Sequence, residues 1–166
     1  MDATELLKSA TELVPKLKSR TELTEDLRQI PQETIRDLLN SGIYQIGVPR
    51  SYGGHSVEYG VCLDVGIELA KGCGSAGWCY SLWTAHAYLI GHWPLAAQEE
   101  VFGGGENALC SSSLNPGRSE IRAVDGGYKL TGRWEFSSGC DAAAWVMLGA
   151  PGFKDRTWML LPSQDY

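Results

Sequence analysis

The sequence has little of several features that define large classes of protein. Lys and Arg number 14 against 20 Asp and Glu, so the net charge is −6 and no basic patch suggests nucleic acid as a partner. No apolar run reaches the roughly 18 residues that a membrane-spanning helix needs. The opening MDATELLKSA carries acids where a secretion signal has basic and then apolar residues. We therefore expect a cytoplasmic protein with neither nucleic acid nor a membrane as its partner.

The 5 cysteines follow neither a metal-binding nor a disulfide pattern. Cys73 and Cys79 do not have CxxC spacing, and no histidine stands at zinc-ligand distance from a cysteine pair. In a reducing compartment these cysteines are expected to be buried thiols. The sequence also has no GxGxxG motif for NAD(P)H. We predict no metal site and no NAD(P)H-binding site of this type.

Up to the glycine triplet at 103–105, apolar residues recur with the period of an α-helix. We expect helices over residues 3–19, about 24–29, 31 to about 41, 57–71, 76–90 and 95–102. Pro15 should kink or break the first helix, and Gly42 is a natural left-handed stop after the third. Ser75 is placed to cap the helix that carries Trp78 and His86. A lone histidine on an apolar helix is more often a core residue than a catalytic one.

After the glycine triplet the apolar residues recur with a period of two, which is typical of strands. The expected strands are 108–112, 119–124, 128–131, 133–137, 144–148 and 157–161, joined by glycine-containing turns. We therefore predict an α+β protein. An all-helical domain over residues 1–104 leads into an incomplete, antiparallel, barrel-like β domain over residues 105–166.

The stretch from Thr131 to Asp141, TGRWEFSSGCD, is the strongest candidate for a binding site. Alternating aromatic and charged residues predict a strand, which then runs into two serines and a glycine. Hydroxyl and backbone N–H donors beside two aromatic side chains could bind a flat polar ligand. The same residues also suit an ordinary β-hairpin with a polar turn, and the stretch alone leaves both interpretations open.

Five stretches, taken in order, resemble the acyl-CoA dehydrogenase fold: VPRSYGGHSVEYG, GCGSAGWCYSLWTAHAYLIGHWP, AQEEVFGGG, CSSSLNPG and VDGGYKLTGRWEFSSGCDAAAWVMLGA. SAGWxxSxxxxH and WxFSSGCDxAxW are more closely similar to its oxygen-activating branch, the reduced-flavin-dependent monooxygenases of phenolic and polyketide-like substrates. The dehydrogenases usually carry KxWITN at the second motif. Phe136 falls where their flavin-contacting Trp stands, and Ser138 where their Thr stands.

The resemblance implies a flavin site and a substrate site. Ser138 would donate a hydrogen bond at the flavin N5 edge, and Phe136 would lie against the isoalloxazine ring. Ser112 and Ser113 would meet the pyrimidine side of the flavin. Trp78 would line the cavity for substrate and flavin, and His86 would stand beside the substrate hydroxyl, where a neutral imidazole can take a phenol proton.

The implied reaction is hydroxylation of a small aromatic substrate by O2 through a flavin C4a-hydroperoxide. A separate flavin reductase would supply the reduced FMN or FAD. Members of this family are more than twice as long as this chain and add a C-terminal helical bundle. We therefore expect the N-terminal portion of such an enzyme, in a homo-oligomer. The alternatives are an acyl-CoA dehydrogenase or oxidase-like flavoprotein fragment and a non-catalytic truncated assembly module.

Overall fold

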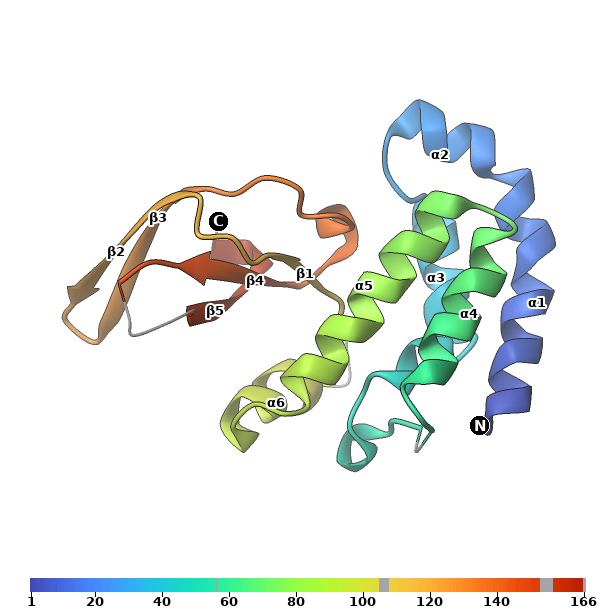
Figure 1. The fold of residues 1–166 in the computed structure, drawn as a ribbon, viewed down its shortest axis with the longest axis horizontal. Coiled ribbons are helices and arrows are strands. Elements are labelled where there is room, and N and C mark those ends of the chain that lie inside the picture. The colour runs from blue at the N-terminus through green and yellow to red at the C-terminus, as the bar shows by residue number, and fades with distance from the viewer. Residues whose placement is uncertain (56, 105–107, 153–156, 166) are drawn as a thin grey trace.

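The computed structural model describes residues 1–55, 57–104, 108–152 and 157–165. The helices gather at one end of the molecule and the strands at the other, with α5 at the junction (Figure 1). The helices of the described residues are α1 (Ala3–Ser19), α2 (Thr21–Leu27), α3 (Gln32–Asn40), α4 (Gly60–Ala70), α5 (Gly74–Ile90) and α6 (Leu95–Phe102). None of them is both long and apolar enough to cross a lipid bilayer.

Helix α1 begins at a capping box, in which the Asp2 side chain accepts from the Glu5 N–H and the Glu5 side chain accepts from the Asp2 N–H. Its buried face consists of Leu6, Ala10, Leu13 and Leu17. Pro15 lies inside the helix, which continues to Ser19, so of the two predicted effects, a kink or a break, the break is wrong. The tertiary packing of this apolar face stabilises the helix on both sides of the proline.

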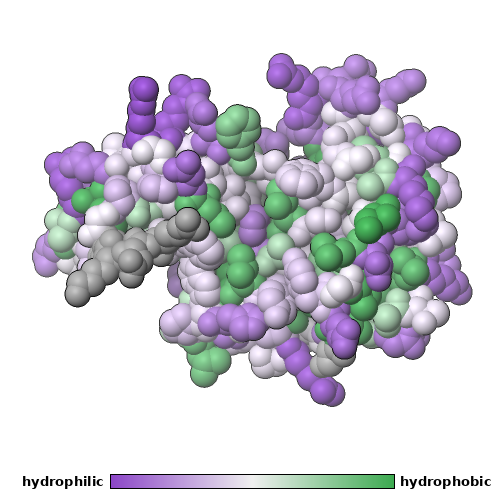
Figure 2. Space-filling model, viewed as in Figure 1, coloured by the Kyte–Doolittle hydropathy of each residue, from purple (hydrophilic) through white to green (hydrophobic). Residues whose placement is uncertain are grey.

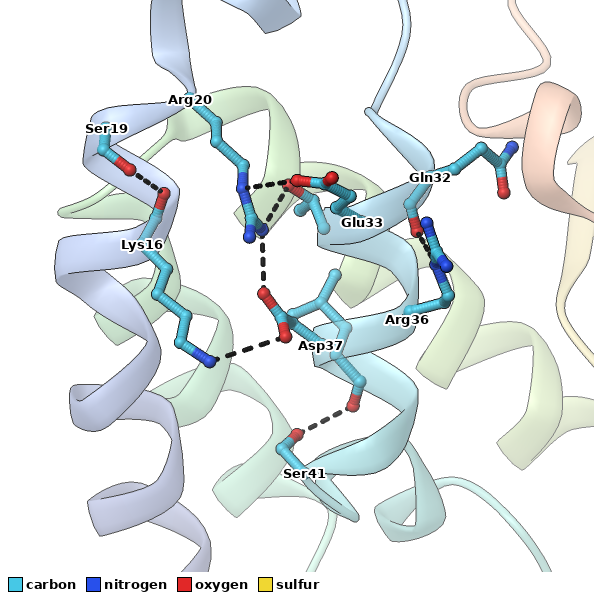
Figure 3. A network of polar contacts seen from close by, with 10 residues as sticks. Lys16, Ser19, Arg20, Gln32, Glu33, Arg36, Asp37 and Ser41 are labelled. Carbon is cyan, nitrogen blue, oxygen red and sulfur yellow. Dashed lines mark hydrogen bonds and ion pairs between the residues drawn. The ribbon is translucent and has the colours of Figure 1, made fainter.

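A polar network joins α1 to α3 on the surface (Figure 3). The guanidinium of Arg20 donates from Nη1 to Asp37 Oδ2 at 2.7 Å, and its Nε lies 3.5 Å from Glu33 Oε2. The ammonium of Lys16 reaches Asp37 Oδ1 at 3.5 Å. The hydrogen bond from Arg20, together with the charge of Lys16, lowers the pKa of Asp37. These contacts tie the C-terminal end of α1 to α3.

Helix boundaries differ from the expected ones where backbone geometry outweighs side-chain periodicity. Helix α2 ends because Arg28 adopts a left-handed conformation, with φ of 56°. Helix α4 begins at Gly60, three residues later than expected. Helix α5 begins at Gly74 with Cys73 as its N-cap, so Ser75 does not cap it. Gly42 adopts the predicted left-handed conformation, with φ of 78°.

Helix α5 packs closely against α4 because glycine allows the two backbones to approach. A Cβ atom at Gly77 would lie 2.8 Å from the carbonyl oxygen of Gly66. The buried face of α5 includes Tyr80, Trp83 and His86, while Trp78 is 60% exposed. Trp78 therefore lies on the side of this helix that faces away from the core. Trp78 is available to line a cavity.

The strands form a three-stranded sheet and a separate hairpin. In the sheet, β4 (Trp145–Ala150) lies between β1 (Cys110–Ser113) and β5 (Thr157–Pro162); β2 (Arg118–Val124) and β3 (Gly127–Arg133) form the hairpin. Strand β1 pairs parallel with β4, so the expected all-antiparallel pairing is wrong at this pair, while β4 with β5 and β2 with β3 are antiparallel. The α+β organisation is confirmed, and the strands of the described residues form no closed barrel.

The expected strand over residues 133–137 does not form. Strand β3 extends through Arg133, and residues 134–137 pair with no strand of the described chain. The cysteines agree in part with expectation, because all five are free and four are buried, whereas Cys140 is exposed. Between the last helix and the first strand the chain passes through residues 105–107, so the predicted domain boundary lies at the edge of the described residues.

Candidate functional site

Strand β1 is joined to the helical end by two buried hydrogen bonds. The Tyr44 hydroxyl donates to the carbonyl oxygen of Ala108 at 2.7 Å, and Nδ1 of His86 lies 2.6 Å from the carbonyl oxygen of Cys110. Tyr44 and His86 are 3% and 5% exposed, so little water competes for these bonds. The Tyr44 bond holds the residues before β1 against the turn Ile43–Ile46, and the His86 bond holds the first residue of β1 against α5.

The hydrogen bonds of His86 define its tautomer. A carbonyl oxygen only accepts, so Nδ1 carries the proton that is donated to Cys110. Nε2 is then the acceptor for the Ser112 hydroxyl, whose Oγ lies 2.9 Å away. Burial lowers the pKa of His86, against an opposing effect of the Cys110 carbonyl. The structure therefore pairs two of the predicted site residues as a neutral imidazole and its hydroxyl donor.

The Phe136–Gly139 segment has an unusual backbone. Phe136 has φ of 60°, a left-handed conformation that is rare for a bulky side chain, and its side chain is 94% exposed. Three residues on, Gly139 has φ of 74°, and its carbonyl oxygen accepts a hydrogen bond from Trp83 Nε1 at 3.2 Å. Strained residues of this kind concentrate at binding sites, where the surrounding structure maintains them. The segment presents an aromatic ring that is exposed to solvent.

Two cavities border this segment. The first, which we call the hairpin cavity, has a volume of about 520 Å³, and its lining includes Ser113, Asn115, Arg118, Arg133, Glu135 and Phe136. The second, the helix cavity, has a volume of about 550 Å³, and its lining includes Arg28, Gln29, Trp78, Cys79, Ser138 and Asp141. Each volume is in the range of small-molecule sites. Successive residues of the chain, Phe136 and Ser137, therefore line different cavities.

The structure distributes the predicted site residues over three positions. Ser113 and Phe136 share the hairpin cavity, whereas Trp78 and Ser138 share the helix cavity. The pair of His86 and Ser112 lies in the interface between α5 and β1 and lines neither of these cavities. Trp78 and Ser138 come together because α5 begins beside the turn that follows Phe136.

Sequence reasoning missed the arginines of the hairpin cavity. Arg118 and Arg133 stand at the ends of two strands, and only the strand register shows that they face each other. Their charge gave no signal, because the whole chain is acidic. The residues around Arg28 in the helix cavity were also missed. They lie in the first helices of the chain, far in sequence from Trp78 and Ser138.

The residues present fit a flavin. An exposed aromatic ring suits an isoalloxazine face, and the serine hydroxyls can meet its polar edge. The Oγ atoms of Ser111 and Ser137 are buried without a hydrogen-bond partner among the described residues. A buried hydroxyl without a partner is uncommon in proteins and suggests that a bound group or water satisfies it. Both serines immediately precede residues implied in the flavin site, Ser112 and Ser138.

Comparison with known proteins agrees with this architecture. Residues 3–102 match the family model described as acyl-CoA dehydrogenase, N-terminal domain, so the chain belongs to that family. It is 36% identical, over 99% of its length, to the flavin-dependent monooxygenase, oxygenase subunit HsaA, of Mycobacterium tuberculosis. It is 35% identical, over 90% of its length, to the FADH(2)-dependent resorcinol hydroxylase, oxygenase component, of a Rhizobium species.

Solved structures give the same result. The crystal structure of the HsaA monooxygenase from M. tuberculosis superposes with a TM-score of 0.91 at 34% identity, over 100% of this chain and 47% of that one. The chain spans 43% of the HsaA sequence and 38% of the resorcinol hydroxylase, so it covers less than half the length of these relatives. The resemblance that the motifs predicted is confirmed.

Proposed function

We propose that this chain is the N-terminal portion of the oxygenase component of a two-component flavin-dependent monooxygenase. Its substrate would be a small aromatic compound of phenolic or polyketide-like type, and a separate reductase would deliver reduced FMN or FAD. The observation that carries the proposal is the Phe136–Gly139 segment, which presents a bare ring and a serine hydroxyl to adjacent cavities. The relatives named as oxygenase components or subunits of flavin-dependent enzymes support it.

When bound, reduced flavin supplies the electrons with which O2 is activated. The chain contributes positioning and protection from water. Phe136 would pack against the ring, and Ser138 would donate a hydrogen bond at the N5 edge and hold the proton there. Trp78, which lines the helix cavity with Ser138, would exclude water from the reacting side. Ser113, in the hairpin cavity, would contact the pyrimidine side of the ring.

His86 would act on the substrate hydroxyl from the interface between α5 and β1. Its Nε2 is a neutral acceptor, which is the form that can take a phenol proton. Because Ser112 occupies that nitrogen at 2.9 Å, a substrate would reach Nε2 only by displacing the serine or by sharing its hydroxyl. With the hydroxyl shared, Ser112 would give its own proton to Nε2 and take up the proton of the substrate hydroxyl, so the serine would end unchanged. Homo-oligomerisation and a cytoplasmic location belong to the same proposal.

The test is an anaerobic titration of reduced FMN into the protein, followed by mixing with O2. Saturable quenching of tryptophan fluorescence is expected, with slower release of hydrogen peroxide than from free reduced FMN. Ser138→Ala should speed peroxide release severalfold, whereas Ser19→Ala, at the end of α1 and in the lining of neither cavity, should leave it unchanged. Absence of saturable binding, or peroxide release at the rate of free reduced FMN in the unmodified protein, would contradict the proposal.

A further inference from the structure

The stretch that follows β3 is held by side chains rather than by a strand partner. Residues 134–137 pair with no strand of the described chain, so no hydrogen-bonded ladder fixes them. At the start of this stretch, the Ser113 hydroxyl donates to the carbonyl oxygen of Glu135 at 2.7 Å. Just beyond its end, Trp83 Nε1 donates to the carbonyl oxygen of Gly139 at 3.2 Å. Two side chains from elsewhere in the chain therefore hold it, one at each end.

Trp83 holds Gly139 by contact as well as by this hydrogen bond. A Cβ atom at Gly139 would lie 2.6 Å from Trp83 Nε1 and 2.8 Å from its Cε2, so the glycine backbone lies directly against the indole ring. The ring is 2% exposed and belongs to the core, where close packing leaves a side chain little room to move. On the face shown in Figure 2, side chains close the junction between the helices and the strands. The turn is therefore seated against α5.

The backbone hydrogen bonds of the turn are local. The N–H of Cys140 donates to the carbonyl oxygen of Ser137 at 3.2 Å, and the N–H of Ala142 donates to that of Gly139 at 3.3 Å. Such bonds shape a turn but do not place it relative to a neighbouring helix. Ser138 lies inside this turn, and its hydroxyl has no hydrogen-bond partner among the described residues. The position of that hydroxyl therefore follows the backbone of the turn.

We propose that Trp83 is a positioning residue of the flavin site. Through Gly139 it holds the turn so that the Ser138 hydroxyl keeps its place at the N5 edge, where a small displacement would cost rate. The inference rests on the proposed function, from which the role of Ser138 comes. Trp83 lines neither of the two cavities, so it acts through the turn. Helix α5 then places two lining residues of the helix cavity, Trp78 directly and Ser138 through Trp83.

The first test follows a thiol beside the turn in the flavin-free protein. Cys79 is 8% exposed and lines the helix cavity together with Gly139. Burial, with the nearby Asp141 and Cys140, raises the pKa of Cys79 to about 11, so little of it is the reactive thiolate. Trp83→Phe keeps an aromatic ring without the N–H donor and should speed modification of Cys79 by N-ethylmaleimide severalfold. The exposed Cys140 is the internal reference, and mass spectrometry distinguishes the two thiols.

Tyr80→Phe is the matched control on the same helix. The Tyr80 hydroxyl donates to the carbonyl oxygen of Ile43 at 3.1 Å, so this variant also removes one buried hydrogen bond to a backbone carbonyl, away from the turn. It should leave the modification of Cys79 unchanged. Gly139→Ala is a second variant that displaces the turn while the indole stays intact. It should speed the modification in the same way as Trp83→Phe, so the test does not depend on one substitution.

The second test mixes the complex with reduced FMN with O2 and measures hydrogen peroxide. Trp83→Phe should speed peroxide release severalfold, whereas Tyr80→Phe should leave it unchanged. Because Trp83 acts through Ser138, the double variant Trp83→Phe/Ser138→Ala should release peroxide no faster than Ser138→Ala alone. Independent effects would instead multiply.

An unchanged rate of either process in Trp83→Phe would overturn the inference. An equal effect of Tyr80→Phe would also overturn it, since general loosening of α5 would then suffice. The same holds if the effects of Trp83→Phe and Ser138→Ala multiply. If the unmodified protein binds no reduced FMN, the proposed function fails and the role of Ser138 fails with it, whereas the modification of Cys79 still shows whether Trp83 holds the turn.

Discussion

His86 Nε2 lies 2.9 Å from Ser112 Oγ, and this hydrogen bond joins α5 to β1 across the junction of helices and strands. We expect Ser112→Ala to lower the free energy of unfolding by about 1–2 kcal/mol, because it leaves the buried acceptor of His86 without a donor. Chemical denaturation measures this loss. Ser138→Ala is the matched control, since its hydroxyl has no hydrogen-bond partner within the described chain. Equal stability of the two variants would contradict the assigned bond.

Acidification should destabilise the protein through His86. Burial lowers the pKa of this imidazole in the folded state, so the unfolded chain, with a pKa of about 6.5, binds the proton more readily. The stability is therefore complete above about pH 6.5 and is lost as pH falls toward the lower pKa of the folded state, with a slope of at most about 1.4 kcal/mol per pH unit.

Denaturation curves between pH 7.5 and 5 measure this slope. His86→Asn keeps an N–H donor for the carbonyl of Cys110 but cannot be protonated, so its stability should depend less on pH in this interval. The exposed His92 provides the control, because His92→Asn should keep the slope of the unmodified protein. An unchanged slope in His86→Asn would show that other groups cause the acid sensitivity.

Gly139→Ala should displace the turn that carries Ser138. A Cβ atom at this position would lie 2.6 Å from Trp83 Nε1, and the φ of 74° adds backbone strain. Gly126 is a matched control, because it has a similar φ of 79° with nothing within 4 Å of a Cβ atom. Gly126→Ala should show the backbone strain alone, about 1 kcal/mol or more.

Thermal unfolding of the two glycine variants separates the two effects. The additional loss in Gly139→Ala measures the contact with Trp83, and it should be accompanied by a changed environment of that indole in tryptophan fluorescence. If both variants lose the same stability and the fluorescence is unchanged, Trp83 does not fix the turn.

The helical half of the fold was the part most fully predictable from sequence. Its apolar period of 3.6 residues reports local geometry, and the expected helices agree with the observed ones to within a few residues. The errors at Arg28 and Ser75 arose from backbone conformation at helix ends, which side-chain pattern does not record. The parallel pairing of β1 with β4 joins segments more than 30 residues apart, so no local signal specified it.

The candidate site was predictable only in its residue types. Motif resemblance selected Phe136 and Ser138, but the alternation of aromatic and charged residues around Phe136 suggested a strand that does not form. The left-handed conformation of Phe136 depends on the surrounding fold and contradicts its intrinsic preference. The pairing of Arg118 with Arg133 required the register of the hairpin, which fixes the face on which each side chain stands.

The central claim is that Phe136 forms part of a flavin site, and the variant Phe136→Gly tests it most directly. The side chain is 94% exposed and the residue has φ of 60°, so glycine removes no packing and relieves backbone strain. Thermal unfolding should show unchanged or slightly increased stability, by up to about 1 kcal/mol.

The measurement is the dissociation constant of anaerobically reduced FMN for the unmodified protein and for Phe136→Gly. An aromatic stacking contact contributes about 1–3 kcal/mol in comparable ring–ring contacts, so its loss should weaken binding by about 5-fold to 150-fold. Weaker binding together with undiminished stability is the predicted result. An unchanged dissociation constant in the stable variant would contradict the placement of the flavin on Phe136.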